Sequence, residues 1–298
     1  MIRRITHLSS VWGILAEARV GASAAQGLEG TSAAQRWSHP ANAAWQQSAC
    51  YSTEEFKKVV QGASPRSLQF QRQPQEEIDA EAQRGFAVKA LLTLGGYYSK
   101  ESRHMRAAQR LYTAVAEQAA APAFLQAVGI PSEFQQVHSS LCLHIWMLLV
   151  RLRPEGKDGK QLAQMLYDDF QTDVEDRARK AGVRVRLQKT LTELEKQFYG
   201  SSMAYDKAMA GGETLEKALL RNVFLLDEAK QADARLLARY VRRELACLAQ
   251  TPSEAVMAGN IKFSSEGLEE EGGAAAAEAA AAAEQGGKAG APAADGAA

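Results

Sequence analysis

Apolar residues in the central part of this 298-residue chain recur at every third or fourth position, and strict alternation of apolar and polar residues is rare. This spacing puts the apolar side chains on one face of an α-helix. Glycine pairs such as Gly95-Gly96 and Gly211-Gly212 interrupt the pattern where helices are expected to end. We therefore predict an all-α fold, with short connections joining the helices into a single bundle.

The predicted helices follow one another closely along the chain. They cover about 76–95, 103–118, a short stretch from Pro122, the stretch from the Ser132 cap to about 153, 160–180, 186–209, the stretch from Leu215 to Leu226, and 231–250. The helix after Ser132 is apolar on both sides, so we expect it to be central. Its run from Leu141 to Val150 is too short to span a bilayer, which takes about 18 apolar residues.

Both ends differ in composition from the middle. Residues 1–50 carry a net charge of +2, and Ile2, Ile5, Leu8, Trp12 and Leu15 form one apolar stripe if the segment is helical. An amphipathic, arginine-bearing, acid-poor N-terminus is typical of a mitochondrial transit peptide. A disordered alanine-rich extension and a chloroplast address are the alternatives.

The C-terminal residues 264–298 carry a net charge of −6 and consist mostly of alanine and glycine. Such a segment cannot bury enough surface to offset its ordering entropy, so we predict a disordered acidic tail. Residues 51–75 are assigned to a linker and 76–263 to the folded helical domain; between the two ends the chain carries about +4. The three cysteines are far apart, which suits a reducing compartment.

A search for catalytic patterns finds no nucleophile elbow, P-loop or dinucleotide-binding fingerprint. Glu101 and His104 match the E-x-x-H motif that a di-iron bundle needs on two helices, but neither His138 nor His144 supplies the second motif. His138 and Cys142 share a helical face, a geometry that can hold a metal, but we interpret them as a hydrogen-bonded histidine beside a core cysteine because no third ligand is near. We predict no catalytic, cofactor or metal site.

An acidic cluster and a basic cluster lie close together in the sequence. Most of the acids are interpreted as an exposed helix face, because Asp173–Arg177, Glu175–Arg179 and Asp176–Lys180 are spaced for intrahelical ion pairs. The basic cluster contains no acid and consists of Arg177, Arg179, Lys180, Arg184, Arg186 and Lys189. Its charge suits RNA phosphates or an anionic membrane surface, and the alternative is an ordinary surface patch.

One segment of the sequence is a distinctive motif, although its residues do not indicate a particular reaction. Residues Leu143 to Arg153 read LHIWMLLVRLR and are followed by Glu155-Gly156 and Gly159-Lys160. They resemble the LHVWMLLVRLR…EG…GK signature of the ubiquinol–cytochrome c chaperone family. Further matches occur in the family's order at Gly96-Tyr97, Arg110–Tyr112, Gly129–Pro131, Phe134, Asp173–Arg177, Gly182-Val183, Ala204–Asp206, Ala218–Phe224 and Tyr240–Arg242. The resemblance covers roughly residues 90–263.

The resemblance implies a non-enzymatic assembly factor for respiratory complex III, acting on newly made cytochrome b at the matrix side of the inner mitochondrial membrane. It further implies a small helical partner protein and a position near the exit of the mitochondrial ribosome. We expect a groove near Trp146 and Tyr205 to hold the client or the small partner, unless Trp146 is a core residue. Arg151, Arg153 and Asp206 are expected to pair inside the bundle, and the basic cluster to face ribosome or lipid.

Two other functions are compatible with the residues. One is a helical-bundle metalloprotein of quinone metabolism, which requires bound iron. The other is a mitochondrial RNA-binding adaptor, whose binding weakens steeply with salt and depends on Arg184, Arg186 and Lys189.

Overall fold

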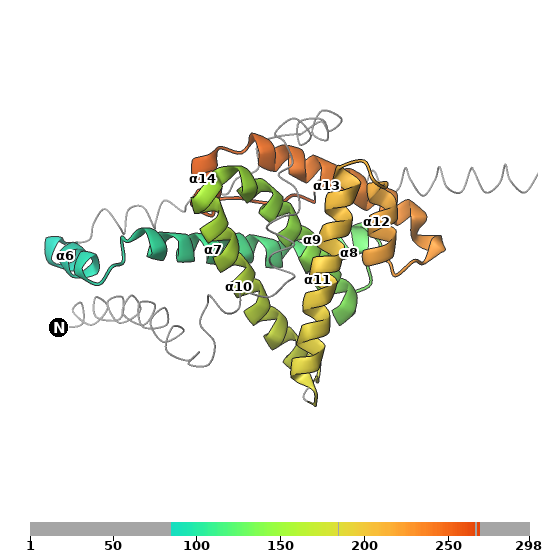
Figure 1. The fold of residues 1–298 in the computed structure, drawn as a ribbon, viewed down its shortest axis with the longest axis horizontal. Coiled ribbons are helices and arrows are strands. Elements are labelled where there is room, and N and C mark those ends of the chain that lie inside the picture. Colours follow the sequence, from blue (N-terminus) through green and yellow to red (C-terminus); the bar gives the residue numbers. More distant parts are fainter. Residues whose placement is uncertain (1–84, 184, 266, 269–298) are drawn as a thin grey trace, which may run out of the picture. The chain divides into compact units, whose positions relative to one another are not determined.

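The protein is described from a computed structural model, which covers residues 85–183, 185–265 and 267–268. The predicted transit peptide, the linker and most of the acidic tail lie outside these residues. All regular structure in the described part is helical, as the periodicity predicts (Figure 1). The helices are α6 (Phe86–Leu94), α7 (Lys100–Ala119), α8 (Pro122–Ala127), α9 (Phe134–Leu152), α10 (Gly156–Lys180), α11 (Leu187–Met209), α12 (Leu215–Asn222), α13 (Gln231–Gln250) and α14 (Ser253–Met257), with short 3-10 turns η1 (Arg153–Glu155) and η2 (Glu228–Lys230).

Among the described residues, 85–99 and 100–268 fall into two compact units. The first contains α6, which ends where Gly96 takes a positive φ of 73°. The second contains all the remaining helices. The sequence prediction placed the residues from 76 onward in one bundle, whereas the structure gives α6 to a separate unit.

Helix α9 is the centre of the second unit. It packs against α7, α10, α11 and α13, and every residue from His138 to Leu152 is buried (Figure 1). The prediction of a central helix is therefore confirmed. Burying one leucine or isoleucine stabilises a fold by about 1.5–3 kcal/mol, so this single helix supplies a large part of the hydrophobic stabilisation.

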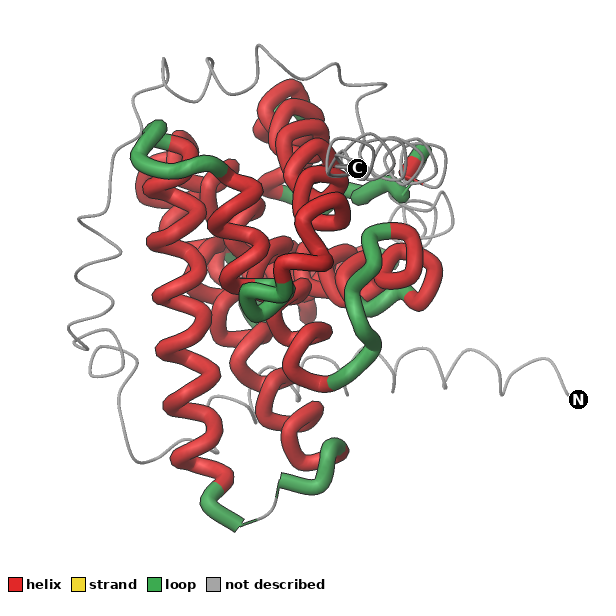
Figure 2. Tube along the Cα trace, turned by 90° about the vertical axis from the view of Figure 1, so that its right-hand side faces the viewer, coloured by secondary structure: helices red, strands yellow, loops and turns green. Residues whose placement is uncertain are grey.

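The helices around α9 also pack against one another. Helix α10 packs along α7, and the pair α12 and α13 follows α11 on the other side. Helices α10 and α11 are joined by a loop around Gly182, which has a φ of 89°, and their ends lie together at the lower edge of the unit (Figure 2). We call this loop and the adjoining helix ends, residues 177–189, the α10–α11 tip.

Two predicted boundaries are wrong by a few residues. Helix α9 begins at Phe134 with an extended Glu133 at the cap position, and Ser132 lies one residue too early to cap it. At the other end, the predicted tail begins at Ser264, yet Leu268 is fully buried. Burial therefore continues beyond Phe263, because Leu268 is one more apolar side chain that is shielded from solvent.

Candidate functional site

Trp146 lies at the middle of α9 and is fully buried. Its indole Nε1 donates a hydrogen bond to Asp206 Oδ1 of α11 at 2.8 Å, and the ring centre of Tyr205 lies 5.2 Å away. An indole N–H that is buried needs an acceptor, and the carboxylate provides one. Trp146 therefore fixes α11 against α9.

The same carboxylate holds the end of α9. Arg153 Nη2 donates to Asp206 Oδ1 at 3.1 Å and to Oδ2 at 2.8 Å. The ion pair is nearly buried, with side-chain exposures of 20% for Arg153 and 7% for Asp206. The predicted pairing inside the bundle is confirmed for Arg153 and Asp206. We call Trp146, Arg153 and Asp206 the α9–α11 cluster.

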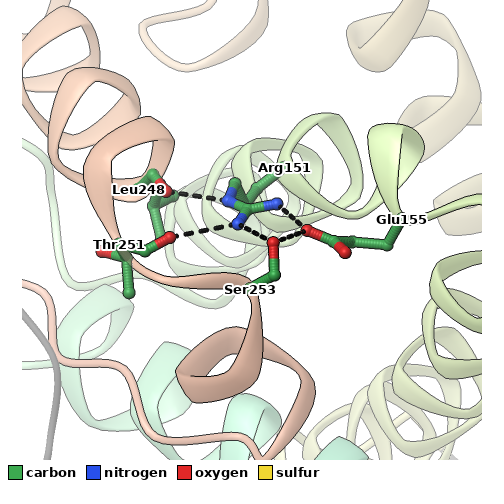
Figure 3. A network of polar contacts seen from close by, with 5 residues as sticks. All are labelled: Arg151, Glu155, Leu248, Thr251 and Ser253. Atoms are coloured by element: carbon green, nitrogen blue, oxygen red, sulfur yellow. Dashed lines mark hydrogen bonds and ion pairs between the residues drawn. The ribbon is translucent and has the colours of Figure 1, made fainter.

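Arg151 has a different set of partners (Figure 3). Its Nε donates to the backbone oxygen of Leu248 at 2.8 Å and one Nη to that of Thr251 at 3.1 Å, while the other Nη pairs with Glu155 at 2.5 Å. Ser253 completes the network by donating to Glu155 at 2.7 Å. The last carbonyls of a helix lack partners within that helix, and the guanidinium supplies them for α13. The expectation that Arg151 pairs with Asp206 is therefore wrong.

The two residues around which a groove was expected, Trp146 and Tyr205, do not reach the surface. Both side chains are fully buried because α11 covers this part of α9. The alternative interpretation, that Trp146 is a core residue, agrees with its position.

The basic cluster divides into paired and exposed residues at the α10–α11 tip. Arg177 binds the carboxylate of Asp173, which also accepts a hydrogen bond from the Tyr112 hydroxyl, and Arg179 binds Glu175. These two intrahelical pairs were predicted, whereas Asp176 and Lys180, both described, do not form an ion pair. Burial and the bond to Asp173 raise the pKa of Tyr112, so its hydroxyl stays protonated as a donor.

Three further bases at the tip project into solvent. Lys180, Arg186 and Lys189 are exposed, and Arg184 lies outside the described residues. Arg186 has a positive φ of 63° at the residue before α11, which turns the chain into the helix. The tip therefore concentrates exposed positive charge at one end of the α10–α11 pair.

The candidate metal ligands remain separate. His138 Nε2 lies 3.3 Å from Cys142 Sγ, and within the described part of the chain no third histidine, cysteine or carboxylate joins them. Burial lowers the pKa of His138 to about 4 and raises the pKa of the Cys142 thiol. His138 stacks between Phe134 and Phe170, with ring centres at 6.4 and 5.9 Å. The pair thus has the surroundings of core residues, as the sequence interpretation held.

A second buried polar pair escaped the sequence analysis. His144 Nε2 and the Tyr240 hydroxyl of α13 lie 2.8 Å apart, and Nδ1 donates to the backbone oxygen of Ser140. Burial lowers the pKa of His144 to about 4, so the ring is neutral and accepts the tyrosine hydrogen. The one available signal was a histidine inside an apolar run, but its partner is 96 residues away in the sequence.

Helix–helix packing around one buried centre, with an exposed basic tip, defines an all-α bundle domain. Residues 126–263 match the family model of the ubiquinol–cytochrome c chaperones. The match confirms the family resemblance that the signature around Trp146 indicated.

Several relatives share this region. The ubiquinol–cytochrome c reductase complex assembly factors 1 of mouse and Drosophila melanogaster are each 28% identical, over 53% and 59% of this chain and 54% and 71% of their own. The human protein of the same name is 30% identical over 47% of both chains. The match thus spans about half the length of the mouse and human relatives.

A solved structure shows the same fold. The crystal structure of the Cbp3 homolog from Brucella abortus superposes with a TM-score of 0.51 and 27% identity, over 58% of this chain and 96% of that one. Among the described residues, no helix is long and apolar enough to cross a membrane.

Proposed function

We propose that this protein is an assembly factor for respiratory complex III and acts in the mitochondrion. The observation that supports this is the family match over residues 126–263, together with relatives whose names describe assembly of the ubiquinol–cytochrome c reductase complex. The resemblance to a chaperone family supports a non-enzymatic role.

We further propose that the client is newly synthesised cytochrome b, bound directly or together with a small helical partner protein. The site of action is the matrix side of the inner membrane, near the exit of the mitochondrial ribosome. The amphipathic, arginine-bearing N-terminus supports import into the organelle. The protein then associates with the membrane peripherally.

The two clusters have different roles in this proposal. Lys180, Arg186 and Lys189 at the α10–α11 tip, with Arg184 beside them in the sequence, face ribosomal RNA or anionic lipid. Trp146, Tyr205 and Asp206 contact no partner and instead keep α9 and α11 in register. Arg151 and Arg153 fix the end of α9, as their buried bonds indicate.

The decisive experiment removes the gene and separates the respiratory complexes on a native gel. We expect complex III to be lost and to return when the gene is restored, while complexes IV and V assemble from their own subunits. Normal amounts of complex III would overturn the proposal. Capture of pulse-labelled mitochondrial translation products on the tagged chain tests the client, and a captured set without cytochrome b contradicts that part.

The tip is tested separately in the restored strain. Replacing Lys180, Arg186 and Lys189 by alanine is expected to reduce co-sedimentation with mitochondrial ribosomes or inner membranes, and to weaken its salt dependence. Matched replacement of Lys157, Lys160 and Lys217, which are also exposed, is the control. Equal sedimentation of both variants would show that the tip is an ordinary surface patch.

A further inference from the structure

The loop that joins α10 to α11 begins with a regular helix end. The amide of Gly182 donates to the carbonyl of Arg179 at 3.0 Å, and the amide of Val183 donates to the carbonyl of Ala178 at 3.0 Å. These two bonds, with the positive φ of Gly182, form the Schellman motif, which commonly places an apolar residue against the last turns of the helix. Val183 occupies that position and is only partly exposed. The end of α10 therefore accounts for the apolar side chain of Val183.

Val185 has no comparable part in the fold. It is 82% exposed, which makes it the most exposed large apolar residue among the described residues of the second unit. The next residue, Arg186, has a left-handed backbone with φ 63° and ψ 27°, which residues other than glycine, asparagine and aspartate rarely adopt. The chain thus turns at Gly182 and again at Arg186, and Val185 projects into solvent between the two turns.

The positive charges at the tip differ in their effect on the helices that carry them. Lys180 lies in the last turn of α10, where a base interacts favourably with the negative end of the helix dipole. Arg186 and Lys189 lie at the beginning of α11, beside the positive end of that dipole, and the first turn of α11 contains no acidic residue. Helix stability therefore does not explain the charges of Arg186 and Lys189.

These charges are not neutralised by neighbouring acids. Residues 177–192 contain no aspartate or glutamate. Within the described ranges, Lys180, Arg186 and Lys189 form no ion pair, whereas Arg177 and Arg179 are paired with acids of α10. The tip therefore combines one exposed apolar side chain with three exposed bases that are available to an anionic partner.

This combination fits an anionic lipid surface better than RNA. Proteins commonly stack the bases of single-stranded RNA on aromatic side chains, and residues 177–189 contain none. An RNA phosphate backbone also offers no apolar surroundings to Val185. A bilayer accepts both kinds of residue, because an apolar side chain enters the boundary of the acyl chains while lysine and arginine stay at the level of the phosphates.

We propose that the α10–α11 tip is a membrane-docking site. Val185 enters the interface of an anionic bilayer, and Lys180, Arg186 and Lys189 bind lipid phosphates around it. Figure 1 shows α10 and α11 converging on the tip, at the edge of the second unit opposite α13. This inference rests on the proposed function, which assigns the tip to RNA or lipid, and it deepens that function by naming lipid as the partner.

A site of this size gives weak and reversible binding. Each base close to an anionic surface strengthens binding by about fivefold, and salt weakens this contribution. Burial of the valine side chain strengthens binding by about tenfold, and this contribution remains at high salt. The two kinds of residue can therefore be distinguished by substitution and by salt dependence.

The first test follows the environment of position 185 in the full chain. Val185→Cys is labelled with an environment-sensitive dye in a Cys50→Ser background, since Cys142 and Cys247 are buried. With vesicles of phosphatidylcholine and phosphatidylglycerol, we expect the dye emission to shift to the blue and to be quenched by spin-labelled lipid. The same dye at Met203→Cys, which is exposed on α11 outside the tip, is the control and should stay in water. A dye at position 185 that stays in water while the chain sediments with the vesicles would overturn the proposal.

The second test measures affinity for the same vesicles by co-sedimentation. Val185→Ser keeps every charge and should bind about tenfold more weakly than the wild type. Leu225→Ser, at an exposed leucine outside the tip, is the matched control and should bind like the wild type. Residues 1–50 are the same in all these chains, so any contribution they make to binding cancels in the comparison. Equal affinities of Val185→Ser and the wild type would overturn the insertion of Val185.

The proposed function and this inference can fail separately. Purified protein and vesicles contain neither ribosomes nor complex III, so vesicle binding is independent of the result of removing the gene. Triple replacement of Lys180, Arg186 and Lys189 by alanine should abolish the preference for anionic vesicles over pure phosphatidylcholine. If the triple variant instead loses only the binding of a short RNA, and the wild type does not bind vesicles, the tip is an RNA-binding site and the proposal is wrong.

Discussion

Arginines in two regions of this molecule differ in burial and in their partners. At the end of α9, Arg151 and Arg153 are largely buried, and their guanidinium groups bind carboxylates and helix carbonyls. At the α10–α11 tip, Arg186 is exposed together with two lysines. A buried charge is tolerated only when it is fully paired, whereas an exposed charge costs little and remains available to a partner. The comparison separates residues that hold the fold together from residues that can be changed without affecting it.

The largest effect should follow the loss of Arg151. Arg151→Met removes a donor from two carbonyls at the end of α13 and the charged partner of Glu155, which keeps only its bond from Ser253, so we expect a loss of about 3–5 kcal/mol in the free energy of unfolding. Arg151→Lys keeps the charge but not the planar fork, and should be intermediate. Denaturant unfolding measures both. If Arg151→Met lowers the free energy of unfolding no more than Arg186→Met at the tip does, buried and exposed arginines do not differ in their contribution to stability.

A smaller effect is expected inside the α9–α11 cluster. Trp146→Phe removes the donor to Asp206, and Asp206→Asn removes the charge that pairs with Arg153. Each change should cost about 1–3 kcal/mol, because a buried polar group loses its partner. The double variant should lose less than the sum, with a coupling of about 0.5–3 kcal/mol. Strict additivity in a double-mutant cycle would show that the cluster does not act as a unit.

Glu244 of α13 gives a pH-dependent effect. Burial raises the pKa of its carboxyl to about 7, although Arg243 nearby opposes the shift. Between pH 4.5 and 7 the folded chain then holds more protons than the unfolded chain, so this group lowers stability as pH rises. Glu244→Gln keeps the oxygen that accepts from Arg243 but does not titrate.

The measurement for Glu244 is the thermal midpoint of both chains from pH 4.5 to 8. The thermal midpoint of the Gln variant should rise relative to that of the wild type as pH rises to about 7. Above that pH the difference between the two midpoints should stay constant. Taking the difference removes the contribution of His138 and His144, whose lowered pKa values destabilise both chains equally in acid. A constant difference would mean that Glu244 is ionised throughout this range.

The smallest effect on stability is expected at the tip. Replacing Lys180, Arg186 or Lys189 by alanine should change the free energy of unfolding by no more than about 0.5 kcal/mol each, because the side chains are exposed. Arg177→Ala provides a contrast, because the guanidinium of Arg177 is bonded to Asp173. Its removal should therefore lower the free energy of unfolding by more than the other three substitutions. If all four substitutions are neutral, the pairing of Arg177 contributes nothing to stability.

Local patterns predicted most of the helices because a helix is a local structure. Gly182 and Gly211 ended their helices where expected, each with a positive φ that suits a C-terminal cap. The cap at Ser132 was predicted wrongly because serine at a plausible position does not ensure the backbone conformation that a cap needs. Leu268 was placed outside the fold because a single apolar residue in an acidic, alanine-rich stretch gives no periodic signal.

The candidate site was predictable only in part. The residues Arg153 and Asp206 were selected together from the sequence, and they do pair. Arg151 was placed with them, but besides Glu155 it binds the carbonyls of Leu248 and Thr251, about 100 residues later in the chain. Backbone carbonyls carry no sequence signature, so no pattern could have indicated them.

The sequence by itself determined the helical class, the order of the helices, the family resemblance and the uneven distribution of charge, since each depends on neighbouring residues or on a recognisable local signature. The tertiary structure decided which charges are used internally, that Trp146 is covered by α11, and that the residues after α14 lie between α7 and α13. These features depend on contacts between residues far apart in the chain, and such contacts exist only after the helices have packed.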